Sequence, residues 1–346
     1  MIANIISRHS LILTDTMTVA DFELSTNADY SGKSQIIFHR QPAATEDDFL
    51  LLYDDGLVFQ GIVGAIENEK GQNHYTVTAL EVHTLFDQKV ILANESLLAT
   101  GIEDFIADQI TGNFISSDDT LLNIPYLTVT AKTHTPIAAK VDATDGIYNL
   151  CTYMGNALTT YGIFTTFEFA ADGLHVVVEK RQQTTLKIDT GLANIVNLSE
   201  IYETKALTKL TVLWNRENVI TQRQFFLRAD RTITEDINDA ERAKGTVDVI
   251  VSAAETEEAM RQEALDKFKA NSYQHKITFD IIPSRLITEG DLYVGHQLQV
   301  KTSMGIKESI ITGLDRKMGY AAVSVTLGQM AVTLIDKLLK GVETVK

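Results

Sequence analysis

Two Asp-Gly steps between β-forming runs constrain the fold of this chain more than any other feature of its sequence. Asp55-Gly56 lies between residues 49–53 and 57–59, and Asp172-Gly173 lies between residues 164–169 and 174–178. Such a link is a strong hairpin signal, because a tight turn needs positive φ and Gly adopts it at little cost. Residues 75–80 add the apolar–polar alternation of a half-buried strand. The sequence therefore predicts a chain dominated by β-strands.

Helical patterns interrupt the strands in three places. Thr100 and Glu103 form a predicted capping box at the start of one helix, which Gly112 would end. An apolar stripe predicts a second helix from about Thr144 to Tyr161. Ser252, with a glutamate three residues later, predicts the start of a third helix. Strands and helices together indicate an α+β fold.

The order of these patterns predicts how the 346 residues divide, since this length suggests two or three domains. We expect two similar small β-barrels with an α+β domain and helical insertions. The first β-barrel would span residues 1–92 and the α+β domain residues 93–185. The second β-barrel region would span residues 186–330, with a helical insertion near 252–271, and residues 331–346 would form a C-terminal helix.

The early and late strand-rich regions follow the same plan. When residues 49–66 are set against 298–315 without gaps, Gly56 falls on Gly305 and Gly64 on Gly313. With one residue of slip, residues 61–66 lie beside 309–314 instead. This internal echo indicates a duplicated barrel. The alternative is two unrelated meanders, because any two meanders share glycine turns and alternation.

Composition excludes several classes of function. Lys and Arg number 30 against 46 Asp and Glu, a net charge of −16. A chain this acidic is a poor general binder of phosphate backbones, and its charge favours solubility or a surface past which a polyanion slides. No apolar run approaches the length of a membrane-spanning helix, and the N-terminus lacks a signal-peptide pattern. We expect no membrane insertion and synthesis in the cytoplasm.

The residues that most often carry chemistry all have a structural interpretation. Cys151 falls within an apolar helical stripe, which favours a buried, inert thiol. Asp54-Asp55 lies in a turn, and Asp118-Asp119 lies in a polar loop without the spacing of a calcium site. Trp214 is expected to pack in a core or an interface. No two histidines stand four residues apart; they are His9, His39, His74, His83, His134, His175, His275 and His296. We expect no catalytic residue, no cofactor and no metal site.

Several segments resemble one family of phage proteins. Residues 59–67, 75–80 and 85–90 are similar to the first domain of tail-tip hub proteins of siphophages and prophages. These tail-associated proteins are related to the myophage baseplate hub. Residues 290–298, 310–315 and 325–328 resemble the closing barrel of such hubs. The resemblance covers most of the chain in the order of its elements, and no single string of residues is diagnostic.

The resemblance implies a structural, non-enzymatic protein of the virion, located at the tail tip and made in the host cytoplasm. Such hubs are homotrimers that join a sixfold tail tube to a threefold tip and surround a channel for passing DNA, which they do not bind specifically. The implied partners are a distal tail or tail tube protein and tail-tip or fibre proteins. Because the sequence stops at Lys346, soon after the last barrel, we expect no lytic module.

Two other functions stay open. One is a carbohydrate-binding or cell-wall-hydrolysing β-protein of the phage tail, whose signature would be a cleft lined by aromatic residues and two carboxylates. The other is a distal tail or tube-like protein of sixfold symmetry. For that role one barrel in each chain would suffice, so the echoed barrels favour the hub.

Overall fold

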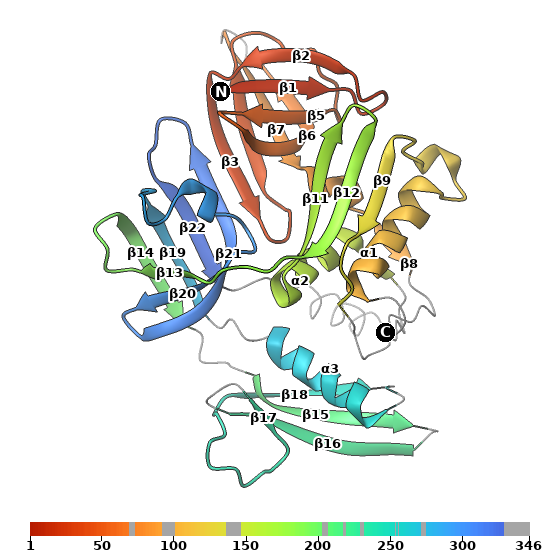
Figure 1. The fold of residues 1–346 in the computed structure, drawn as a ribbon, viewed down its shortest axis with the longest axis vertical. Helices are drawn as coiled ribbons and strands as arrows, with labels where there is room; N and C mark the ends of the chain where they lie inside the picture. The colour runs from red at the N-terminus through yellow and green to blue at the C-terminus, as the bar shows by residue number, and fades with distance from the viewer. Residues whose placement is uncertain are drawn as a thin grey trace.

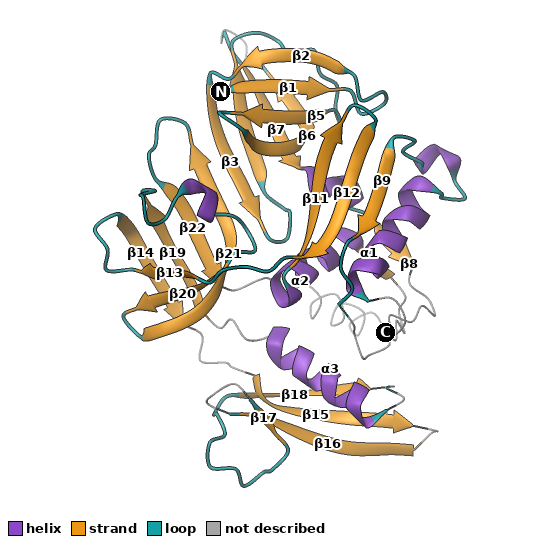
Figure 2. Cartoon of the chain, in the orientation of Figure 1, coloured by secondary structure: helices purple, strands orange, loops and turns teal. Residues whose placement is uncertain are grey.

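A computed structural model gives the architecture of the chain (Figure 1). The structure describes residues 1–68, 73–91, 101–135, 147–202, 207–216, 219–228, 232–252, 254, 256–270 and 275–328. Strands predominate, and the α-helices lie in two places, as Figure 2 shows. The expectation of a β-dominated α+β chain is therefore confirmed. The helix expected over residues 331–346 lies outside the described residues.

One large sheet of 13 strands organises most of the chain, and it has two halves. The first half contains β1 (Ile2–Ile6), β2 (Leu13–Thr18), β3 (Asp21–Asn27), β4 (Lys33–Phe38), β5 (Phe49–Tyr53), β6 (Leu57–Glu67) and β7 (Tyr75–Glu81). The second half contains β13 (Leu186–Asp189), β14 (Ile195–Tyr202), β19 (His275–Ile281), β20 (Gln297–Thr302), β21 (Gly305–Lys317) and β22 (Val323–Gly328). Each half has its own apolar core.

The two halves are joined edge to edge by strands β21 and β3. Residues 313–317 of β21 pair antiparallel with residues 23–27 of β3. Among the described residues the sheet is an open path from β14 to β2, and its two end strands do not pair with each other. The two closed barrels expected from the sequence are therefore not seen. The physical reason is that β3 uses its free edge to pair with β21 instead of closing its own half.

The strand pairing reveals a repeat between the halves. In the hairpin of β5 and β6, Phe49 lies opposite Ile62; in the hairpin of β20 and β21, Gln297 lies opposite Ile310. The offset is 297 − 49 = 248 residues for the first members and 310 − 62 = 248 for the second. The third strands follow the same offset, since β7 starts at Tyr75 and β22 at Val323. The alignment with one residue of slip is the one that the pairing supports.

A β-bulge occupies the same place in both repeats. The pairing of β6 with β7 shifts between Val63 and Ala65, and that of β21 with β22 shifts between Ile311 and Gly313. The extra residue of each bulge bends its strand and increases the local twist. Because the same irregularity stands 248 residues apart in both halves, the likeness extends beyond the general features that any two meanders share.

The hairpin turns form where the sequence predicts them, although not for the predicted reason. In the turn between β5 and β6 the backbone N–H of Asp54 donates to the carbonyl of Gly56 at 2.9 Å. It is Asp55 that adopts positive φ, at 52°. Gly173 serves another purpose, since a Cβ there would lie 2.6 Å from the carbonyl oxygen of Tyr126. Close approach of two backbones, not left-handed φ, requires the second glycine.

An α+β unit packs against the first half of the sheet. Its three-stranded sheet contains β9 (Leu127–Ala131), β11 (Ile163–Ala170) and β12 (Gly173–Lys180), and its helices are α1 (Ile102–Ile110) and α2 (Leu150–Tyr161). Smaller elements are η1 (Val82–Phe86), η2 (Thr111–Ile115), η3 (Thr120–Leu122), β8 (Lys89–Ile91) and β10 (Ile147–Asn149). One core joins this unit to Phe49 and Ile62 of the first half, so the two pack as one body.

The helix starts differ from those expected. Helix α1 begins after Gly101 without a side-chain cap, because the carboxylate of Glu103 instead accepts hydrogen bonds from Thr133 and Thr135. The chain continues from α1 into the π-helical turn η2, so the predicted end at Gly112 is also wrong. Helix α2 begins at Leu150, since residues 147–149 pair as strand β10.

A separate layer is inserted between β14 and β19. It contains β15 (Leu207–Arg216), β16 (Val219–Leu227), β17 (Ile233–Thr234) and β18 (Thr246–Ser252), covered on one face by α3 (Glu257–Ala270) (Figure 1). The hydroxyl of Thr256, not that of Ser252, accepts a hydrogen bond from the first turn of α3. This layer has its own core around Trp214 and Met260.

Candidate functional site

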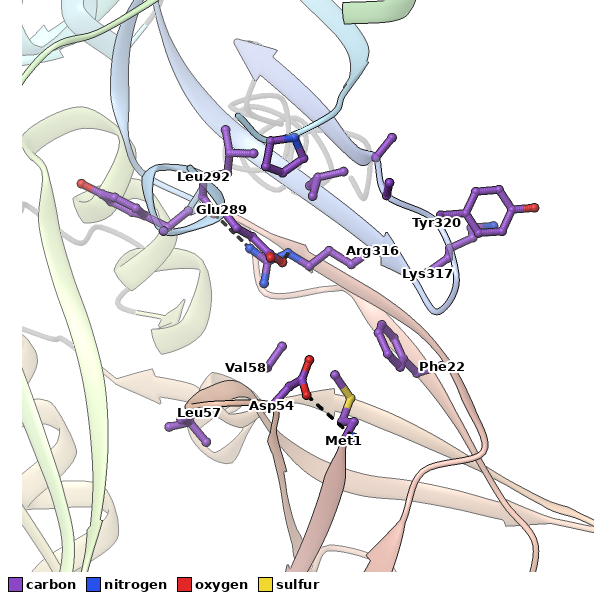
Figure 3. Close-up of a pocket in the computed structure, with 16 residues that line it drawn as sticks. Met1, Phe22, Asp54, Leu57, Val58, Glu289, Leu292, Arg316, Lys317 and Tyr320 are labelled. Carbon is purple, nitrogen blue, oxygen red and sulfur yellow. Dashed lines mark hydrogen bonds and ion pairs between the residues drawn. The ribbon is translucent and has the colours of Figure 1, made fainter. Parts of the chain in front are cut away.

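A cleft of about 490 Å³ lies at the seam between the two halves of the large sheet. The first half contributes Met1, Phe22 and the start of β6 at Leu57 (Figure 3). The second half contributes the end of β21 and the short helix η4 (Glu289–Asp291) with the residues that follow it. The cleft lies beside the paired ends of β3 and β21, where Lys317 is opposite Glu23.

Ion pairs line both sides of this cleft. The N-terminal amine of Met1 lies 3.8 Å from Asp54, and the Arg316 guanidinium lies 3.5 Å from Glu289 (Figure 3). At the edge of the cleft, the Lys317 ammonium lies 2.8 Å from the carboxylate of Glu23 in β3. The carboxylate of each pair is more than half exposed, and pairs open to solvent in this way contribute about 1 kcal/mol or less each. Each of these cations has an acidic partner, so the cleft is a balanced surface without a strong field of one sign.

Carboxylates and aromatic rings occur together in the cleft, which is the signature expected for sugar binding. Asp54 and Glu289 face the space, and Tyr293 and Tyr320 lie at its wall. However, the two carboxylate side chains are 66% and 60% exposed, and each lies beside a cation. A general acid of a glycosidase needs an apolar setting that keeps it protonated. The cleft can accommodate a ligand, but these two groups are poorly placed for hydrolysis.

The other acidic and sulfur-bearing candidates have structural roles. Asp119 caps the turn η3 by accepting a hydrogen bond from the N–H of Leu121 at 3.1 Å. Cys151 is buried, its thiol donates to the carbonyl of His83 at 2.8 Å, and burial raises the pKa of the thiol. Trp214 packs in the core of the inserted layer. Within the described ranges, no three His, Cys, Asp or Glu side chains are grouped to hold a metal ion.

Sequence reasoning missed a buried polar group beneath the turn between β3 and β4. Glu81 accepts a hydrogen bond from the backbone N–H of Asn27 at 2.8 Å, and burial raises the pKa of its carboxyl to about 8. Burial also lowers the pKa of His83 to about 4, and its ring stacks on Tyr30 at 3.8 Å. The alternation of β7 contained the signal, because Glu81 falls on the same face as the buried Val77.

The turn above Glu81 connects three parts of the molecule. Ala28 donates its N–H to the carbonyl of Thr312 in the second half at 2.9 Å. The Ala28 side chain packs with Leu158 and Phe164 of the α+β unit. Two residues later, Tyr30 enters the core shared by that unit and the first half. A change in the charge of the buried carboxyl therefore acts on a junction, not on an isolated loop.

Comparisons with known proteins place this architecture among phage tail proteins. No family model and no curated protein matches the chain. The prophage tail protein gp18 from Listeria monocytogenes EGD-e superposes with a TM-score of 0.58 at 12% identity, covering 99% of both chains. The tail protein from Neisseria meningitidis MC58 gives 0.57 at 10% identity, covering 95% of this chain and 97% of that one. The 43 kDa tail protein of prophage MuSo2 from Shewanella oneidensis gives 0.55 at 11%, covering 95% and 98%.

At such identities the similarity concerns the fold. The chain has the fold of phage and prophage tail proteins over nearly its whole length, which confirms the resemblance seen in the sequence at that level. In the part of the chain that the structure describes, no helix is long and apolar enough to cross a membrane.

Proposed function

We propose that this chain is a structural component of a phage or prophage tail and that it acts as the hub of the tail tip or baseplate. The observation that carries the proposal is the fold shared with three tail proteins over at least 95% of this chain. The protein is then a part of the virion, made in the host cytoplasm, and its working parts are surfaces. We propose no catalytic, cofactor or metal site.

The repeat supports a homotrimeric hub. Three copies contribute six halves, so a trimer matches a sixfold tail tube on one side and a threefold tip on the other. In this proposal each half of the open sheet corresponds to one of the two barrels expected from the sequence. The partners are a distal tail or tail tube protein and tail-tip or fibre proteins.

The charge of the chain supports a channel for DNA. Specific or non-specific binding of DNA depends on Lys and Arg that displace counterions from the phosphates. A net charge of −16 opposes such binding, so DNA would pass through the ring without being held.

Solution mass and particle symmetry test the hub. Sedimentation and native mass spectrometry across a wide concentration range should show a species of three times the chain mass of 38.3 kDa. Electron microscopy of that species should show a ring with threefold symmetry and a central channel. A chain that stays monomeric at every concentration, and also beside its tube partner, contradicts the proposal.

The cleft supports a second candidate, a carbohydrate-binding role, because it brings carboxylates and aromatic rings together. Titration with cell-wall oligosaccharides tests it, with a Tyr293→Ala variant as the control. Binding that the variant abolishes favours this role. Absence of binding, together with absence of cell-wall degradation, eliminates it.

A further inference from the structure

The join between the two halves uses one strand from each repeat. Strand β21 of the second half pairs with β3 of the first, with Leu314 opposite Thr26 and Asp315 opposite Ser25. Such a join is heterologous, because it brings together two different surfaces of the repeated unit. Each half uses only one of its two surfaces in such a join. The first half therefore keeps its equivalent of β21 free, and the second half keeps its equivalent of β3 free.

The first unused surface is the end of β6. Subtracting 248 from Leu314 and Asp315 gives Ile66 and Glu67, the last residues of that strand. Strand β5 pairs with β6 only as far as Ile62, and β7 occupies the opposite edge. Val63 still exchanges two backbone hydrogen bonds with the loop residues Asp47 and Asp48. Beyond Val63, no strand in the described part of the chain pairs with this outer edge of β6.

The second unused surface is the end of β14. In the first half Glu23 of β3 lies opposite Gln35, which lies opposite Thr78. In the second half Ser199 of β14 lies opposite Thr278, which lies opposite Thr326. Because 326 − 78 = 248, the two threonines are equivalent, and Glu23 and Ser199 are therefore equivalent as well. Counting on from Ser199, the counterparts of Ser25 and Thr26 in β14 are Ile201 and Tyr202.

Strand β14 has one partner, β19, among the described strands, and its other edge is open. That edge is also unusually apolar for an exposed strand: Val196, Leu198 and Ile201 are 43%, 43% and 52% exposed. An open apolar edge is a template for pairing with another chain. The complementary edge that the repeat calls for lies on another copy of this same chain.

From these two open edges we infer that β6 of one copy pairs antiparallel with β14 of the next copy. Ile66 would lie opposite Tyr202, and Glu67 opposite Ile201. Three such joins, alternating with the three joins inside the chains, close a ring of six halves. The inference rests on the proposed homotrimer and names the strands that form it.

The charges at this join differ from those inside the chain. The internal join has the ion pair of Lys317 with Glu23 at 2.8 Å. Across the join between copies, β6 carries Glu67 and β14 carries Glu200, and Ser199 occupies the place that Glu23 has in the internal join. The join between copies is therefore acidic on both strands. Raising the ionic strength screens this repulsion, so assembly should strengthen with salt.

Engineered disulfides test the pairing directly. Residues directly opposite in antiparallel strands have Cα atoms about 4.5–5.5 Å apart, within the range of a disulfide. In the double variant Glu67→Cys and Ile201→Cys, the two thiols of one chain lie on β6 and β14, which six strands of the sheet separate, so each disulfide links two copies. Both positions are exposed, and the native Cys151 is only 4% exposed, which keeps it out of the reaction.

Two matched variants control the experiment. Ser25→Cys with Asp315→Cys places thiols at the internal join, where an intramolecular disulfide must form if the chain is folded. Glu67→Cys with Val196→Cys moves the second thiol to the other end of β14, where linkage should be absent. Circular dichroism checks that all variants keep their strand content.

The expected result on non-reducing gels is a series of linked species that ends at three copies for Glu67→Cys with Ile201→Cys. If this variant stays unlinked while the internal control links, the pairing is overturned, even where mass measurements show a trimer and the proposed function stands. Equal linkage of the Val196→Cys control also overturns it. A series that continues beyond three copies refutes the closed ring. A chain that is unlinked and that stays monomeric at every concentration, also beside its tube partner, contradicts the pairing and the hub together.

Discussion

Replacing Glu81 with glutamine should remove most of one pH-dependent contribution to the stability of this protein. Burial raises the pKa of the Glu81 carboxyl from 4.5 to about 8, because it lies beneath the β3–β4 turn near Asp29. Between these two pH values the folded chain holds a proton that the unfolded chain has lost. The free energy of unfolding therefore falls as pH rises through this window.

The size of the effect follows from the same two values. The separation between 4.5 and about 8, at 1.36 kcal/mol for each pH unit, corresponds to roughly 5 kcal/mol lost by pH 8. Glutamine is neutral at every pH, and its Oε1 can accept the same hydrogen bond from Asn27 that the carboxyl accepts at 2.8 Å. At pH 7 we expect Glu81→Gln to be more stable than the native chain by about 3 kcal/mol.

Urea denaturation at pH values from 4.5 to 9, followed by far-UV circular dichroism, measures this difference. Hydrogen exchange over residues 21–38 adds a local measurement, because the Asn27 amide is the donor to Glu81. The native chain should lose protection there as pH rises, after correction for the intrinsic exchange rate, and Glu81→Gln should not. Parallel pH profiles for the two proteins would refute the reasoning, since the difference between the profiles isolates this single carboxyl.

Two further predictions concern packing. Gly173→Ala should destabilise the chain by about 1–3 kcal/mol, because the added Cβ would lie 2.6 Å from the Tyr126 carbonyl oxygen; Gly112→Ala, with open space at its Cβ, should change stability by less than about 1 kcal/mol. Phe86→Ala should cost about 3–5 kcal/mol in the core of the α+β unit, where this ring is fully buried. Trp214 fluorescence reports on the inserted layer and its separate core, so its urea midpoint should not move in Phe86→Ala; a joint shift would mean that layer and unit unfold together.

Local features of the fold could be predicted from the sequence because their causes are local. The two hairpins form at the Asp-Gly steps, and the alternation of β7 correctly separates inward from outward side chains. The alternation of residues 75–80, extended by one residue, places Glu81 on the buried face, although Glu81 belongs to no sequence motif. The echo between residues 61–66 and 309–314 was visible, and the strand register identifies its offset.

Features that depend on distant partners could not be predicted. The expected capping box does not form, because the Glu103 carboxylate accepts hydrogen bonds from Thr133 and Thr135, which follow β9 some 30 residues along the chain. The pairing of β21 with β3 joins Gly313 to Asn27, and backbone hydrogen bonds leave no mark on residue type. This one pairing decides that the halves share an open sheet. An expectation of closed barrels was therefore reasonable for each half alone and wrong for the two together.

The repeat also explains why the join between copies should be weaker than the equivalent join inside the chain. Inside the chain the two halves are tethered, so the join of β21 with β3 forms at a high effective concentration and gains the pair of Lys317 with Glu23. An equivalent join between copies must overcome lost translational and rotational freedom, and it does so between chains that each carry a charge of −16. The same strand geometry is then stable in one setting and marginal in the other. A sixfold partner that holds three copies side by side would supply the missing proximity, so the ring should form most readily on the tail tube itself.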